Sequence, residues 1–178
     1  DEEITYDAGR YFLTFAWMLP FTQMSSLTSS FLQCAGDMLT AALLELHPDR
    51  EAFIAKMNAA LGGRAVITAS ADSKCGIKGT HVSVLINGDE EGTVLHHEHQ
   101  PTSIAEILGF IAAAPLPDKV RSDAAAVYKM LADAESRVHG APVDQIHFHE
   151  VGTLDALADV VGVCLLFELL SPEQVLCS

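Results

Sequence analysis

The segment TLDALADVVGVCLLFELL, Thr153–Leu170, carries the strongest structural signal in the chain. We predict a helix over Leu154–Leu170, with Thr153 as its N-cap. Apolar side chains surround this helix on all sides, so we expect other elements to enclose it. Asp155 and Asp159 lie one turn apart on one face. Carboxyl groups on a buried helix require a reason, which is either the nearby helix N-terminus or a functional role.

The segment IHFHEVG, Ile146–Gly152, leads directly into that helix. In an extended chain His147 and His149 project to one side, while the phenylalanine between them packs on the other. Two imidazoles at this spacing can bind one metal ion, and Glu150 can act as a third ligand or as a base. Asp155 would then orient the histidines or take part in catalysis. Glu150 and Asp155 are therefore the candidate catalytic residues.

A second histidine cluster lies near the middle of the chain. His96, His97 and His99 surround Glu98, and neutral imidazoles favour borderline ions such as nickel, zinc, copper or iron. We predict His96, His97 and His99 as further metal ligands, with a solvated polar loop as the alternative. Neither cluster has a closely spaced cysteine, which argues against a structural zinc site. The sequence leaves open whether the two clusters meet in space.

Composition identifies an acidic globular protein. The 178 residues are 49% apolar and 19% charged, which is typical of a folded domain. Ten Lys and Arg residues against 24 Asp and Glu residues give a net charge of −14. Such a chain has no general means of neutralising phosphates, so we expect neither nucleic-acid nor membrane partners. The acidity suits a cation such as a metal ion, although it also serves solubility.

Cysteine usage and the N-terminal residues bear on the compartment. Four scattered cysteines without CxxC spacing indicate reduced thiols and a cytoplasmic location. The uncharged run Tyr11–Phe21 follows acidic residues and is too short to span a bilayer. We interpret that run as buried core or as an interaction segment. P-loop, GxSxG and GxGxxG motifs are absent from the sequence, so phosphate-loop and serine-hydrolase chemistry have no support.

Periodicity and capping signals predict a mixed α/β or α+β fold, namely a helix-rich domain with a small sheet. Ser103 and Glu106 form a capping box that opens one of the helices. The predicted helices lie near residues 38–46, 48–61, 104–114, 118–138 and 154–170, and the predicted strands near 64–70 and 80–86. Asp37 lies near the start of the first helix, and Gly62 with Gly63 ends the second.

Five segments of the sequence resemble motifs of the LarC family of nickel-insertion proteins, and the resemblance covers roughly residues 35–171. HFHEVG with its downstream aspartate is the specific motif, and the others support it. The motifs are GDML (Gly36–Leu39), CGIKGT (Cys75–Thr80), AESRVHG (Ala134–Gly140), HFHEVGTLD (His147–Asp155) and ADVVG (Ala158–Gly162).

The resemblance implies a cyclometallase of the lyase class. The family inserts nickel into pyridinium-3,5-bisthiocarboxylic acid mononucleotide, forms a nickel–carbon bond and consumes CTP with Mg²⁺ or Mn²⁺. The product, a nickel-pincer cofactor, passes to the lactate racemase apoprotein. A base near the metal would help remove the ring proton that the carbon loses, and Glu150 is the candidate.

The resemblance also implies a domain organisation. Residues 1–33 form an atypical N-terminal segment, and residues 34–178 match the N-terminal metal-binding domain. We expect the nucleotide-associated C-terminal half to be absent, and the protein to be a homo-oligomer. Three alternatives remain open: a non-catalytic nickel chaperone or storage domain, a metal-dependent hydrolase, and a pH-sensitive histidine surface on a structural module.

Overall fold

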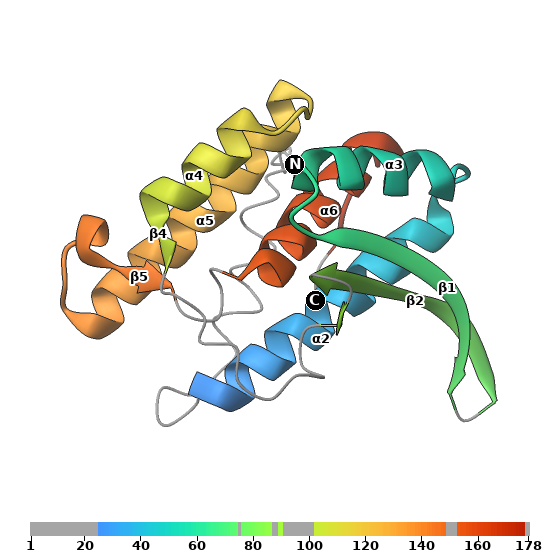
Figure 1. The fold of residues 1–178 in the computed structure, drawn as a ribbon, viewed down its shortest axis with the longest axis horizontal. Helices are drawn as coiled ribbons and strands as arrows, with labels where there is room; N and C mark the ends of the chain where they lie inside the picture. Colours follow the sequence, from blue (N-terminus) through green and yellow to red (C-terminus); the bar gives the residue numbers. More distant parts are fainter. Residues whose placement is uncertain (1–24, 75, 87–88, 91–101, 149–152, 177–178) are drawn as a thin grey trace.

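The computed structural model describes residues 25–74, 76–86, 89–90, 102–148 and 153–176 (Figure 1). Helix α6 (Leu154–Leu170) occupies its centre. Helices α2 (Ser25–Leu46), α3 (Arg50–Leu61) and α5 (Asp118–His139) pack against α6, and α4 (Ile104–Ala113) packs against α5. The prediction of a helix-rich domain with a small sheet is confirmed.

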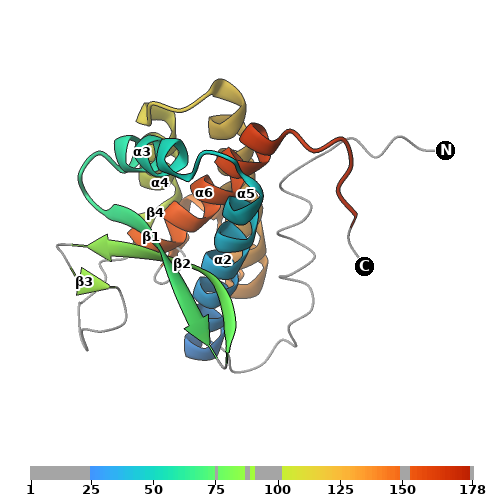
Figure 2. The same cartoon turned by 90° about the vertical axis from the view of Figure 1, so that its right-hand side faces the viewer.

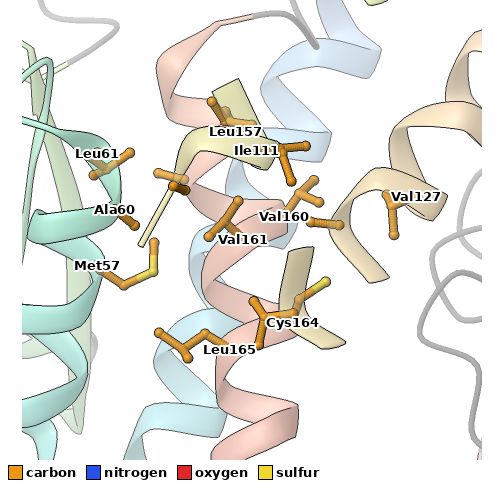
Figure 3. Packing of buried hydrophobic residues seen from close by; sticks show 14 of the residues in the cluster. Met57, Ala60, Leu61, Ile111, Val127, Leu157, Val160, Val161, Cys164 and Leu165 are labelled. Carbon is orange, nitrogen blue, oxygen red and sulfur yellow. The ribbon is translucent and has the colours of Figure 1, made fainter. Parts of the chain in front are cut away.

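Every residue of α6 from Leu157 to Leu166 is buried, as its uniformly apolar sequence predicts. Figure 3 shows Met57 and Leu61 approaching α6 from α3, with Ile111 and Val127 on the opposite side. Thr153 caps the helix, since its hydroxyl oxygen accepts the amide hydrogen of Ala156 at 3.2 Å. The helix bounds and the cap agree with the prediction.

The larger sheet has three antiparallel strands in the order β1–β2–β3. Strand β1 (Val66–Lys74) pairs with β2 (Ile77–Ile86), and β2 pairs with the short β3 (Asp89–Glu90). Val82 and Val84 face the core, as the alternating pattern predicts. Both long strands extend further toward the turn than predicted, and the resulting hairpin tip projects from the helical body (Figure 1).

Two side chains attach this hairpin to the helices. The Thr80 amide donates to Glu45 Oε1 on α2 at 2.8 Å. On α3, Asn58 Oδ1 accepts from the Ile67 amide at 2.8 Å, and its Nδ2 donates to the Ile67 carbonyl at 3.2 Å. The carboxamide of Asn58 thus occupies the place that a neighbouring strand would take beside β1. Figure 2 shows the hairpin between α3 and α2 in the turned view.

A second, two-stranded sheet joins distant parts of the chain. Strand β4 (Thr102–Ser103) pairs antiparallel with β5 (His147–Phe148), with Thr102 opposite Phe148 and Ser103 opposite His147. A 3₁₀ turn, η1 (Val143–Gln145), precedes β5.

Two helix starts differ from the sequence-based expectation. The helix predicted over 48–61 begins at Arg50, with Asp49 as its N-cap. A helix over 38–46 with Asp37 near its start is wrong, because α2 begins at Ser25 and carries Asp37 in its interior. The serines and threonines at 25–30 have modest helix propensity and carry no apolar stripe, so the sequence gives no signal for the first turns of α2. In the described part of the chain, no helix combines the length and apolarity needed to cross a membrane.

Candidate functional site

Strand β5 divides its two side chains between core and surface. Phe148 is buried and contacts Tyr128 of α5 edge-on, with ring centroids 6.2 Å apart and an interplanar angle of 72°. His147 is exposed on the other face. The predicted alternation is confirmed for these two residues, with Phe148 packed in the core and His147 on the exposed face.

The pairing of β4 with β5 relates the two histidine clusters. Thr102 follows His99 by three residues, and Phe148 immediately precedes His149. The described parts of the chain beside each cluster therefore share one ladder. The other predicted ligands, namely His96, His97, His99, His149 and Glu150, lie outside the described residues.

A carboxylate that the sequence analysis assigned only to helix capping stands near His147. Glu106 Oε2 accepts the amide of Ser103 at 2.8 Å and the hydroxyl of Ser103 at 2.8 Å, which completes the capping box at the start of α4. Ser103 is also the residue directly opposite His147. The pKa of Glu106 is lowered chiefly by the hydrogen bonds from Ser103, with a further contribution from the His147 imidazole.

Three carboxyl groups gather where α2 meets α6. Asp155 and Asp159 are 7% and 5% exposed, and Asp159 forms a hydrogen bond with Asp37 of α2. Burial, together with the nearby carboxylates of Asp37 and Asp155, raises the pKa of Asp159 to about 9. The carboxyl group of Asp159 is therefore protonated at neutral pH, and its O–H donates a hydrogen bond to the Asp37 carboxylate. The absence of a side chain at Gly36 permits the contact, because a Cβ there would overlap the Asp159 carboxyl group.

The acidic cluster of Asp37, Asp155 and Asp159 favours a bound proton, because burial and the neighbouring carboxylates stabilise the neutral form of Asp159. Within residues 25–74, 76–86, 89–90, 102–148 and 153–176, no three His, Cys, Asp or Glu side chains are placed to hold a metal. Tyr128 lies between this cluster and β5, since its ring contacts Phe148 edge-on and Asp159 is close enough to affect its hydroxyl. Burial raises the pKa of that hydroxyl above its ordinary value, and Asp159 adds to the effect.

The sequence analysis missed the place of two residues. Asp37 was expected at a helix start, and only the neighbouring Gly36 could have indicated a close helix contact. The position of Glu106 beside His147 depends on the register of β4 and β5, which are two residues long each and show no periodicity.

Three other histidines have polar partners close by in the sequence, and one cysteine is buried in the core. His47 contacts the Asp49 carbonyl at 2.9 Å, His81 contacts the Ser83 hydroxyl at 3.0 Å, and His139 pairs with Glu135 at 3.2 Å. Cys164 is 3% exposed, and burial raises its pKa to about 12, so its thiol is packed and unreactive.

Comparisons with known proteins show that the chain is similar to nickel insertion proteins. A putative nickel insertion protein of Methanococcoides burtonii is 34% identical over 83% of this chain and 35% of its own length. The pyridinium-3,5-bisthiocarboxylic acid mononucleotide nickel insertion proteins of Akkermansia muciniphila and Lactiplantibacillus plantarum are 34% and 32% identical, over 79% and 84% of this chain. The chain spans 35% and 38% of those two relatives. No solved structure matches it.

The family model described as nickel insertion protein matches residues 30–178. This range contains most of α2, all of α3 to α6, both sheets and both histidine clusters. The chain belongs to the nickel insertion protein family.

Proposed function

We propose that this chain supplies the nickel-binding part of a cyclometallase that inserts nickel into pyridinium-3,5-bisthiocarboxylic acid mononucleotide. Membership of the family supports the role of nickel, and the names of two relatives support the substrate. The β4–β5 ladder is the structural observation that supports the proposal, because it joins the described residues that lie next to the two histidine clusters in the sequence.

The pairing of β4 with β5 limits the distance between His99 and His149, because each lies a few residues from the paired positions Thr102 and Phe148. Three residues of chain span at most about 11 Å when fully extended, and this is the separation between His99 and Thr102 in sequence. On the other strand, His149 directly follows Phe148, the partner of Thr102. One nickel site drawn from both clusters is therefore compatible with the fold. Its proposed ligands are His96, His97, His99, His147, His149 and Glu150.

The proposed chemistry requires a base beside the metal. Formation of a nickel–carbon bond breaks a ring C–H bond, and the proton needs an acceptor. We assign Glu150 as that acceptor and Asp155 as a residue that supports it from the first turn of α6. Nickel enters this reaction as a substrate.

The remaining components belong to the reaction as a whole. CTP with Mg²⁺ or Mn²⁺ is proposed to act through the part of the longer relatives that this chain does not span. The lactate racemase apoprotein is the proposed acceptor of the product. A cytoplasmic location and a homo-oligomeric state remain predictions from the sequence.

Calorimetry with Ni²⁺ and Zn²⁺ at fixed pH tests the site. We expect saturable nickel binding that weakens at least about 100-fold in the double variant His147→Ala/His149→Ala, because two ligands are lost. The matched control His81→Ala/His139→Ala removes two histidines with structural partners and should bind as the parent does.

Three outcomes would change the proposal. Unchanged nickel binding in the β5 double variant would contradict a site at this strand. Nickel binding without a metallated product, when substrate and CTP are supplied to the full protein, would favour a nickel chaperone. Hydrolytic turnover that depends on zinc or manganese and needs no nickel would favour a hydrolase.

A further inference from the structure

The ladder between β4 and β5 fixes which residue lies across from His147. Ser103 and His147 are direct partners in the antiparallel register. Side chains at directly opposite positions lie on the same face, with Cβ atoms about 5 Å apart. A side chain that is hydrogen-bonded to Ser103 is therefore brought to the same face of the ladder as the His147 imidazole.

Ser103 holds the carboxylate of Glu106. Its amide and its hydroxyl both donate to Glu106 Oε2 at 2.8 Å, and the Glu106 amide donates back to the Ser103 hydroxyl at 3.3 Å. These three hydrogen bonds restrain an otherwise exposed side chain. Both hydrogen bonds from Ser103 end at Oε2 of this carboxylate, so neither of them occupies Oε1.

We infer that Glu106 is a positioning residue for His147. A carboxylate that accepts one ring N–H fixes the tautomer and the orientation of an imidazole, and directs the other ring nitrogen to a metal. The consequence for nickel rests on the proposed function, whereas the proximity of Glu106 and His147 rests on the β4–β5 register and on the effect of His147 on the pKa of Glu106.

The variant Glu106→Gln separates this role from helix capping. Glutamine at the third helical position can also complete a capping box, so α4 should keep its N-terminus. The charge of the carboxylate is lost. The matched control Glu135→Gln removes the same charge from the exposed pair that Glu135 forms with His139 at 3.2 Å.

In metal-free protein at pH 7, we expect Glu106→Gln to shift the ring ¹⁵N resonances of His147, and Glu135→Gln to leave them in place. With nickel, Glu106→Gln should weaken binding about 10-fold, in the range typical of lost outer-shell partners. The melting temperature should stay close to that of the parent, which shows that the capping box survives.

The outcomes distinguish this inference from the proposed function. Unshifted His147 resonances in metal-free Glu106→Gln would overturn the inference whatever the metal does. Parent-like nickel affinity in Glu106→Gln, with weakened affinity in His147→Ala, would overturn the nickel role of Glu106 alone. Parent-like affinity in both variants would overturn the nickel role of Glu106 together with the site at β5.

Discussion

Asp159 shows how a single residue can make the stability of this protein depend on pH. Its carboxyl group is 5% exposed, forms a hydrogen bond with Asp37 and has a pKa of about 9. In the unfolded chain the pKa returns to about 3.9. Between these values the folded state binds more protons than the unfolded state, so the free energy of unfolding falls as pH rises.

The variant Asp159→Asn removes this dependence. Its amide still donates to Asp37 but does not ionise, so urea unfolding at pH 6 and pH 9 should show a smaller loss of stability in the variant. We expect a difference of at least about 1 kcal/mol, since one proton contributes up to about 1.4 kcal/mol per pH unit. Asp133→Asn on the exposed side of α5 is the control. Parallel pH curves for the parent and Asp159→Asn would contradict the shared proton.

Single residues also show what the sequence could predict. The burial of Asp155 and Asp159 follows from their place on a helix that is apolar all round, and it is confirmed. Their partner Asp37 was not foreseen, because no sequence pattern states which helix faces which. All of the predicted histidine ligands stay a prediction, and His147 is the one that lies within the described residues.

Among the elements, the α2–α6 contact depends on two glycines in different ways. A Cβ at Gly36 would overlap the Asp159 carboxyl group. A Cβ at Gly162 would lie 3.6 Å from Met57 Cε and from Thr40 Cγ2, which is ordinary van der Waals contact. Gly36 thus sets the separation of the two helices, whereas Gly162 leaves room for a methyl group.

These two positions form a matched pair of variants. Gly36→Ala should lower the free energy of unfolding by about 1–3 kcal/mol through overpacking. Gly162→Ala should leave it unchanged or raise it by up to about 1 kcal/mol, because alanine favours helix. Chemical denaturation of both variants checks the pair, and equal stabilities would show that α2 does not approach α6 this closely.

The ends of helices could be predicted where capping or turn residues mark them in the sequence. The Thr153 cap, the Ser103–Glu106 box and the turn at Gly62 (φ 60°) agree with the structure. The start of α2 was not foreseen, since its first turns lack such a signal. Strands β4 and β5 are too short for alternation to be recognised, although they pair the residues that flank the two histidine clusters in the sequence.

For the whole molecule, the enclosure of α6 makes its cysteine a reporter of global unfolding. Cys164 is 3% exposed with a pKa of about 12, and α2, α3 and α5 all pack against its helix. A thiol reagent needs an exposed thiolate. Labelling of Cys164 should therefore require separation of these helices.

We expect native Cys164 to react at least about 10³-fold more slowly than in denatured protein, in line with ordinary domain stabilities of 5 kcal/mol or more. The other three cysteines are replaced by serine, and labelling is followed by mass spectrometry in increasing urea. The denaturant dependence should equal that of global unfolding by circular dichroism. Rapid labelling without denaturant would show that α6 opens locally.

The Asn58 carboxamide has a consequence for chemical ageing. It meets Ile67 with one acceptor and one donor, and thereby blocks the open edge of β1. Deamidation to aspartate would replace the donor nitrogen with a second oxygen, facing the Ile67 carbonyl oxygen. Two acceptors repel each other, so a chain aged in this way would expose a strand edge to neighbouring molecules. One slow hydrolysis on a helix could thus convert a protected sheet into a template for aggregation.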